Sequence, residues 1–237
     1  MENPRAKITY LFHSGFSVET AGHLLLFDYC PSLARDPIVT SEFLKSKESV
    51  YVFVSHSHGD HFDPAILQWA KNNSAITYVF SSDVPFDPSN INCHVMSPYE
   101  RWVDRMIEIK TFGSTDAGLS FLVQVDGLSI FHAGDLNWWR WSGETQDEQD
   151  HAEKIFKEEM DKIAGQKIDI AFFPVDRRLE EYYSLGAEYF AARLKPKLLI
   201  PMHFGRDFDA TKVFAEKAGK ISLATVEITQ KGQEILF

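Results

Sequence analysis

The chain has 237 residues, 44% of them hydrophobic, which suits one large α/β domain or two small ones and a core that needs no disulfide support. A formal net charge of −10 argues against a general nucleic-acid binder, because a phosphate backbone is neutralised by a basic face and no lysine or arginine cluster provides one. We expect no membrane insertion, since no run of eighteen apolar residues occurs, and no secretion signal. Two cysteines outside any CxxC pair predict free thiols in a reducing cytoplasm.

Short β-rich segments alternate with helical stretches along the whole chain. The predicted strands are residues 7–12, 23–27, 50–55, 76–80, 119–125, 128–132, 168–173, 198–201 and 226–228. Such alternation predicts a layered α/β (α+β) protein. The Asp126-Gly127 pair between two of these strands predicts a hairpin turn. We expect residues 1–237 to form one domain with two similar halves that meet near residue 100.

Two helices have clear start or stop signals. One is predicted to begin at Asp63 as N-cap with Pro64 at its first position. Its buried stripe would consist of Ala65, Ile66, Trp69 and Ala70. The other spans 147–164, with apolar residues three and four apart and Gly165 as the C-terminal cap.

Between the third predicted strand and the first of these helices, the chain reads His-Ser-His-Gly-Asp-His. In an extended segment residues two apart point the same way, so His56 and His58 can converge on one ion. Gly59 permits a sharp turn that brings Asp60 and His61 toward a neighbouring position. One short loop can therefore serve two metal ions.

Imidazole and carboxylate ligands together suit zinc, manganese or iron, and we expect one or two zinc ions. A metal-activated water is the expected nucleophile of a hydrolase. No Gly-x-Ser-x-Gly motif is visible, which argues against a serine nucleophile.

The motif His-x-His-x-Asp-His resembles the signature of the metallo-β-lactamase superfamily. The resemblance extends from about residue 7 to residue 228 and implies a four-layer αββα sandwich, with two mixed sheets flanked by helices and the metals at one sheet edge. It implies that Asp135 bridges two metals, that His203 is a late ligand, and that Asp28 orients the histidine loop from behind.

The chain departs from the family pattern at one ligand. Where the family supplies another histidine for the first metal site, residues 111–116 contain none. The histidines of that interval are His94 and His132, and His132 lies too close to Asp135 along its strand to be an easy substitute. The resemblance thus implies a second site of Asp60, His61, Asp135 and His203. It leaves the first site with His56, His58 and the bridging Asp135. That site would be weak, empty, or completed by Asp116, Thr115 or water.

Further residues are candidates for catalysis and substrate binding. The segment around His13 resembles the ascorbate-6-phosphate lactonase-like branch of the superfamily, which implies that His13 lies close to the centre as a polar contact or proton carrier; a structural strand-end histidine is the alternative. Asp60 is predicted to be a catalytic residue as well as a ligand. Trp138 follows the bridging aspartate and would wall the cleft or cover the sheet edge. Arg177 and Arg206, like Arg178, follow predicted strand ends and would suit an anionic group.

The leading hypothesis is a metal-dependent hydrolase of a small, anionic ester, lactone or phosphodiester. A second hypothesis is a metal- or ligand-binding protein with little hydrolytic activity, because the first site lacks a histidine. A di-iron redox role is disfavoured since no flavodoxin-like domain follows. The partner is expected to be a small molecule rather than nucleic acid or membrane, and a homo-oligomer stays open.

Overall fold

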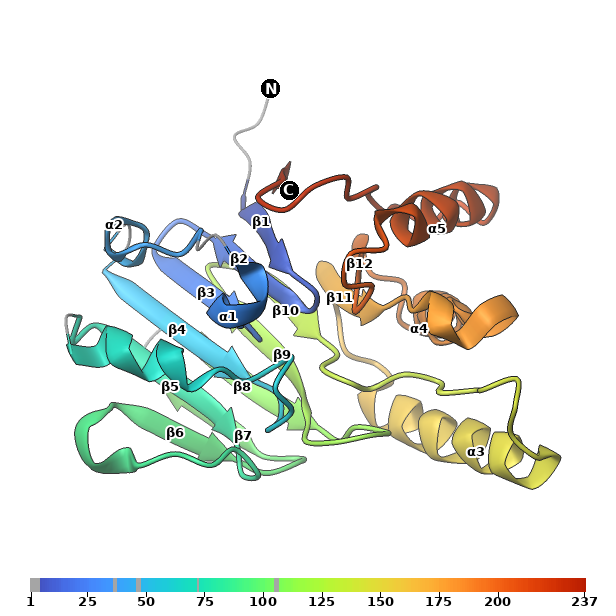
Figure 1. Cartoon of the computed structure of the whole chain (residues 1–237), viewed down its shortest axis with the longest axis horizontal. Coiled ribbons are helices and arrows are strands. Elements are labelled where there is room, and N and C mark those ends of the chain that lie inside the picture. Colours follow the sequence, from blue (N-terminus) through green and yellow to red (C-terminus); the bar gives the residue numbers. More distant parts are fainter. Residues whose placement is uncertain (1–4, 36–37, 46–47, 72, 105–106) are drawn as a thin grey trace.

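The structure is a computed structural model, and it describes residues 5–35, 38–45, 48–71, 73–104 and 107–237. Two mixed β-sheets pack face to face and helices flank them, as expected for an αββα sandwich. Figure 1 shows α3, α4 and α5 on one side of the pair of sheets and α1 and α2 on the other.

The first sheet has the strand order β13-β1-β2-β3-β4-β5-β6. Its strands are β1 (Lys7–Phe12), β2 (Gly15–Glu19), β3 (His23–Phe27), β4 (Ser49–Val54), β5 (Ile76–Ser81), β6 (Cys93–Met96) and β13 (Glu234–Leu236). Pairing is parallel from β3 to β6 and antiparallel elsewhere.

The second sheet has the order β12-β11-β10-β9-β8-β7. Its strands are β7 (Arg101–Asp104), β8 (Ile107–Phe112), β9 (Ser120–Val125), β10 (Leu128–His132), β11 (Ile170–Pro174) and β12 (Leu198–Met202). The pairs β10–β11 and β11–β12 are parallel, and the others are antiparallel. The chain passes from the first sheet to the second between residues 96 and 101.

The helices are α1 (Pro31–Ala34), α2 (Ser41–Leu44), α3 (Gln146–Ile163), α4 (Leu185–Leu194) and α5 (Phe208–Lys220), with the 3₁₀ helices η1 (Pro64–Lys71), η2 (Pro88–Asn90) and η3 (Arg177–Tyr182). The predicted 147–164 helix is confirmed as α3, which begins with a capping box between Thr145 and Glu148. The predicted helix after Asp63 is the 3₁₀ helix η1, and Ala65 is exposed rather than buried.

Alternate residues of the central strands face two separate apolar layers. In β3, Leu25 and Phe27 pack between the sheets, whereas Leu24 and Leu26 pack on the opposite face, in the layer that also holds Ile66 of η1. Both faces are therefore buried, which is why this strand reads as a continuous apolar run.

Most predicted strands are confirmed to within two residues, but 226–228 is not a strand: Thr225 makes only an isolated bridge to Leu199. Five strands, β2, β6, β7, β8 and β13, were not predicted. The Asp126-Gly127 hairpin is confirmed, with both residues at positive φ (48° and 72°), as a type I′ turn requires. Cys30 and Cys93 are free, as expected. Among the described helices, none has the length and apolar character needed to span a bilayer.

Candidate metal centre

The predicted ligands come together at one edge of the sandwich because each follows the end of a strand. The contributing loops follow β1 (His13), β3 (Asp28), β4 (residues 56–61), β8 (Thr115 and Asp116), β10 (Asp135), β11 (Asp176) and β12 (His203).

Two glycines allow these loops to approach one another closely. A Cβ atom on Gly118, whose φ is +65°, would lie 2.0 Å from the carbonyl oxygen of Ser55. A Cβ on Gly134, whose φ is +54°, would lie 2.8 Å from the Cβ of Ser55. The loops after β8 and β10 therefore pack directly on the start of the histidine loop, and a larger residue at either position would separate them.

The first group of potential metal ligands contains His56, His58, Asp116 and Asp135. The Nε2 atom of His56 lies 3.0 Å from Nδ1 of His58 and 3.3 Å from Oδ2 of Asp135. The ligand atoms of His58, Asp116 and Asp135 all lie within 4.8 Å of one another. A carboxylate of the 111–116 segment, which lacks the expected histidine, thus lies beside His58 and Asp135.

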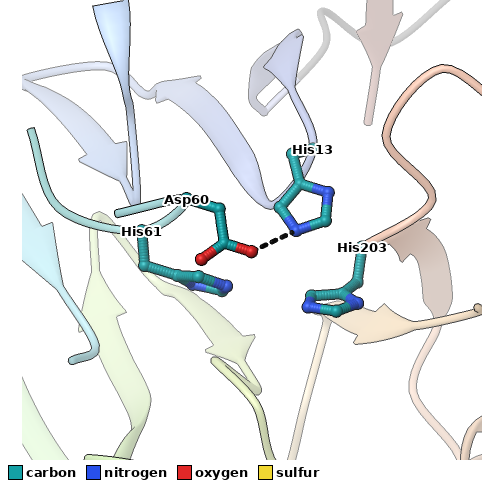
Figure 2. Close-up of side chains that lie close together, drawn as sticks. All are labelled: His13, Asp60, His61 and His203. Carbon is teal, nitrogen blue, oxygen red and sulfur yellow. Dashed lines mark ion pairs between the residues drawn. The ribbon is translucent and has the colours of Figure 1, made fainter. Parts of the chain in front are cut away.

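The second group contains His13, Asp60, His61 and His203, whose ligand atoms also lie within 4.8 Å of one another (Figure 2). Nε2 of His13 lies 3.2 Å from Oδ2 of Asp60. The Oδ1 atom of Asp135 lies 3.1 Å from Nε2 of His61 and 3.4 Å from Nε2 of His203. Asp135 therefore contacts both groups, one carboxylate oxygen toward each.

Three buried polar atoms at this centre are unpartnered in the sense that they make no hydrogen bond of normal geometry among the described residues, although charged or polar neighbours lie within 3.2 Å: Nε2 of His13, Nε2 of His61 and Oδ1 of Asp135. Buried polar atoms are nearly always partnered, so unpartnered atoms that face one another need an explanation. Imidazole nitrogens and a carboxylate oxygen are all ligands for a divalent cation. The residues present fit a metal ion.

The electrostatics of the centre also favour a cation. Burial raises the pKa of Asp135, but the hydrogen bonds and charges of His56, His61 and His203 outweigh burial and hold this pKa well below its usual range. Burial lowers the pKa of His61, yet the flanking carboxylates of Asp28 and Asp135 raise it to about 10. The site therefore stabilises positive charge between its acids. Burial lowers the pKa of His13.

Asp28 lies behind the histidine loop, where the sequence placed it. Its Oδ1 accepts the backbone N–H of Ser55 at 2.8 Å, and its Oδ2 accepts the Ser55 hydroxyl at 2.7 Å. Oδ2 also lies 2.8 Å from Nδ1 of His61, and the Ser55 hydroxyl lies 2.9 Å from Nδ1 of His56. This network leaves the Nε2 atom of each ring facing the centre.

Asp176 holds His203 in the same way and was not singled out from the sequence. Its Oδ2 lies 3.0 Å from Nδ1 of His203, which leaves Nε2 facing Asp135. Burial raises the pKa of Asp176, but hydrogen bonds from His203 and Arg178 outweigh it, and the pKa is lowered. The sequence signal for Asp176 is an acidic residue just after β11, the strand that precedes β12 and His203. Acids at strand ends are too common for this signal to be distinctive.

Three residues that were predicted to contact substrate, Trp138, Arg177 and Arg206, do not line the main cleft. Trp138 is buried against Phe156 and Tyr189 in the core, whereas the neighbouring Trp139 and Trp141 line the cleft. A side chain's direction depends on the exact turn of the loop after β10, which sequence does not show.

The two named arginines also lie apart from the main cleft. Arg206 borders a separate hollow near Phe12 and Arg35. Arg177 faces Asp207 and borders a smaller hollow whose lining also includes His13, Asp60 and His203. Arg178, which follows β11, is the arginine in the lining of the main cleft.

The two other histidines of the interval do not reach the centre. His132 is buried, stacks on Phe27 and lies 2.9 Å from the carbonyl oxygen of Ser14 through Nε2. His94 stacks on Trp102. Neither replaces the missing ligand.

The centre lies in a cleft of about 710 Å³. His58, Asp60, Asp116, Asp135 and His203 line one end of it. The loop after β10 and the first turns of α3 line the rest, so a small molecule that fills the cleft would contact both.

A helix-flanked pair of sheets with clustered histidines and aspartates at the strand ends defines the metallo-β-lactamase class of metallohydrolases. The profile of the family described as a beta-lactamase superfamily domain matches residues 7–203, and the chain belongs to that superfamily. The expected enzyme class, a metal-dependent hydrolase, is thereby confirmed.

Relatives agree with this class. A protein of Desulforamulus reducens named UPF0173 metal-dependent hydrolase is 26% identical over 254 residues, covering 96% of this chain and 98% of the relative. Among solved structures, Igni18, described as a novel metallo hydrolase from Ignicoccus hospitalis, has a TM-score of 0.67 at 19% identity and 98% coverage of both chains. CmlA, described as a diiron β-hydroxylase from Streptomyces venezuelae, has a TM-score of 0.64 at 11% identity and covers all of this chain but 55% of its own. These structural likenesses concern the fold.

Proposed function

We propose that this enzyme hydrolyses an ester, lactone or phosphodiester bond of a small molecule at a centre of two metal ions that share Asp135. The observation that carries the proposal is the set of buried, unpartnered ligand atoms of His13, His61 and Asp135 that face one space. Zinc is the metal we expect, with manganese or iron as alternatives for the same ligand types.

In this proposal, His56, His58 and Asp135 bind the first ion, and Asp116 takes the place of the missing histidine. The support is that the ligand atoms of His58, Asp116 and Asp135 lie within 4.8 Å of one another. His58 and Asp116 are exposed, so this site keeps a side open to water and substrate, which is typical of catalytic metal sites.

Asp60, His61, His203 and Asp135 bind the second ion. His13 stands at this site with its Nε2 atom toward Asp60, close enough to contact the ion, hold substrate or carry a proton. The positive φ of His13, 56°, places its ring there, and its backbone N–H donates to the Tyr10 hydroxyl at 2.9 Å.

When bound, the ions lower the pKa of a water molecule toward neutrality and polarise the oxygen of the bond that is attacked. The chain's own residues orient the reaction. Asp28 and Asp176 fix the rings of His61 and His203, so the ligands are in place before substrate arrives. The ring of Trp139, 5.4 Å from that of His203, limits the access of bulk water on one side.

The resemblance to the lactonase-like branch, a cytoplasmic location and the choice of metal stay predictions. The preference for an anionic substrate also stays a prediction: Arg178 lines the main cleft but is paired with Asp176, and Arg177 borders a smaller hollow beside His13, Asp60 and His203.

The test is His58→Ala and Asp135→Ala, with His94→Ala as a control that removes an imidazole remote from the centre. We expect both ligand variants to lose metal and to lose hydrolysis of an ester, lactone and phosphodiester panel by at least about a hundredfold, as removal of a catalytic metal's contribution implies. Circular dichroism should show an intact fold, since the ligands are at loop ends. Full turnover by both variants would refute the proposed centre.

The same experiment decides between this function and the binding-protein hypothesis, which the absence of the site-one histidine favours. Tight metal uptake by the wild type with no turnover of the panel would support a binding protein. Visible absorption of an iron-loaded sample tests the di-iron alternative.

A further inference from the structure

The cleft beside the metal centre has an outer end to which hydrolysis assigns no role. Trp139 lies next to the centre, with its ring 5.4 Å from that of His203, and the outer lining continues through Trp141, Glu144, Asp147 and His151 of the loop after β10 and the first turns of α3. A substrate held at the centre and filling the cleft of about 710 Å³ would place its remote part against these residues.

The aromatic wall of this outer end is fixed in place. Nε1 of Trp139 donates to the carbonyl oxygen of Asp135 at 2.9 Å, which ties the ring to the backbone of the proposed bridging ligand. The ring of Trp141 is nearly parallel to that of Trp139, at 10° and 6.2 Å between centroids. The buried amide of Gln149 donates to the carbonyl oxygen of Trp141 at 3.0 Å. Both rings are thus ordered without a ligand.

The charge of the cleft is strongly negative. Six carboxylates line it: Asp60, Asp116, Asp135, Glu144, Asp147 and Glu148. Arg178 is the single lysine or arginine among its lining residues within the described part of the chain, and Asp176 pairs with it. Bound metal ions offset the charge of the three aspartates at the centre. They do not neutralise the three acids contributed by the α3 end.

Two of these outer acids lack a cationic partner. Glu148 is engaged in the capping box of α3. In the described ranges, no lysine or arginine lies within 4.0 Å of the carboxylates of Glu144 or Asp147. An indole face attracts a cation through its quadrupole, and unpaired carboxylates add Coulombic attraction. Oε2 of Glu144 accepts the backbone N–H of Trp141 at 3.4 Å, which places a carboxylate without a cationic partner beside this tryptophan. Such an arrangement suits an ammonium group.

Resting on the hydrolase function proposed above, we infer that the substrate carries an ammonium group at the end remote from the bond that is cleaved. The scissile ester, lactone or phosphodiester lies at the metal centre, and the cationic group lies beside the ring of Trp141 and the carboxylates of Glu144 and Asp147. A neutral apolar group would gain the aromatic contact alone, and an anion would be repelled at this end.

The experiment compares three probes of one length on the metal-loaded chain: 4-(trimethylammonio)butanamide, its neutral carbon isostere 5,5-dimethylhexanamide, and glutaramate as the anion. Dissociation constants come from ligand-observed NMR and need no turnover. The cationic probe should bind about tenfold more tightly than the neutral isostere, in the range that cation–π and ion-pair contacts supply. The 4-nitrophenyl esters of the three corresponding acids, with an ester in place of each probe's amide, then give kcat/KM for hydrolysis.

The double variant Glu144→Gln with Asp147→Asn should lose most of this preference, and Trp141→Leu should reduce it. The matched control is Asp150→Asn with Glu158→Gln. It removes the same amount of negative charge, at exposed positions of α3 outside the cleft. The control should keep the wild-type preference. Raising the ionic strength should weaken the preference in the wild type, because exposed charges are screened.

The outcomes separate the two proposals. Preferential binding of the cation without hydrolysis of any ester supports the ammonium site and counts against the ester reaction. Equal binding of the cationic probe and its neutral isostere, or an equal loss of preference in the control variant, overturns the ammonium site, whether or not the esters are cleaved.

Discussion

Acidic side chains behind the proposed ligands set the direction of the histidine rings. A ring turns one nitrogen to the centre because an acid holds its other nitrogen. Asp28 orients His61 directly and His56 through the Ser55 hydroxyl, and Asp176 orients His203. Both acids are buried, so each is committed to this contact rather than to solvent. Such carboxylate-to-histidine contacts raise ligand basicity and fix ring direction.

We therefore expect Asp28→Asn and Asp176→Asn each to lower metal affinity by about 10- to 100-fold, because the amide cannot fix the ring as an ionised acid does. A competitive titration against a chromogenic chelator measures the change. Asp169→Asn, which alters an acid bound to Ser129 and Lys197 away from the centre, should leave affinity unchanged. Wild-type affinity in both acid variants would argue that the rings are held by packing alone.

A single acid also ties the two sheets together at the end of the sandwich remote from the centre. Asp126, in the β9–β10 turn, accepts hydrogen bonds from Thr20 (2.6 Å) and the Gly22 N–H (2.9 Å), and its Oδ2 lies 3.0 Å from Nδ1 of His23. Burial raises the pKa of Asp126, but these hydrogen bonds outweigh it and the pKa is lowered.

A lowered folded-state pKa means that Asp126 stabilises the fold above its unfolded pKa of about 4, and that this stability is lost as pH falls through the folded pKa. Asp126→Asn should thus reduce the free energy of unfolding by about 1 kcal/mol at pH 7. The difference from wild type should shrink below about pH 4. Urea unfolding at several pH values measures it. A difference that stays constant with pH would mean the carboxylate charge is not responsible.

Among the elements, α3 reaches the centre indirectly through a buried acid. Glu159 accepts the backbone N–H of Gly113 at 2.6 Å, the hydroxyl of Tyr99 at 2.9 Å and the ammonium of Lys162 at 2.8 Å. Gly113 begins the loop that carries Thr115 and Asp116, so this contact sets where that loop leaves β8. A Cβ on Gly113 would lie 2.8 Å from the Glu159 carboxylate, which shows how close the two elements are.

Glu159→Ala should destabilise the fold by about 1–3 kcal/mol, because the Gly113 N–H is left buried without an acceptor. It should also reduce metal stoichiometry, because Asp116 is proposed to complete the first site. Glu158→Ala, which removes the exposed neighbouring acid, is the matched control. Elemental analysis with thermal unfolding measures both effects. Full stoichiometry in Glu159→Ala would show that Asp116 does not depend on this anchor, or is not a ligand.

For the whole molecule, the centre joins loops from both sheets, so a bound ion links the two halves of the sandwich. The second group alone draws on β1 and β4 of the first sheet and β12 of the second. Without a cation, acids and imidazoles from these loops face one another with unpartnered atoms. Metal binding is therefore expected to stabilise the folded state as well as to activate it.

Removal of metal by a chelator should lower the melting temperature by about 10 °C, since an ion at a thousandfold excess over its Kd contributes about 4 kcal/mol and 1 kcal/mol corresponds to about 2–4 °C at this chain length. Differential scanning calorimetry before chelation, after it, and after zinc is restored measures the shift. The Asp135→Ala variant should show a much smaller response. An equal response in that variant would place the stabilising ion elsewhere.

The sequence alone determined the class of the fold and predicted most of the proposed ligands, because these depend on local pattern: apolar strands, the Asp-Gly turn, and histidines and acids directly after strand ends. It could not determine which tryptophan of the run after Asp135 faces the cleft, which arginine is near the centre, or that Asp176 supports His203. Those depend on loop direction and on contacts between distant segments. The 226–228 segment and the five strands that were not predicted, which include the edge strands β6, β7 and β13, were misjudged for the same reason. Hydrogen-bond partners on other strands decide whether a short segment becomes a strand. Only the tertiary structure brought Asp116 close to His58 and Asp135 and set acids and an indole ring at the outer end of the cleft.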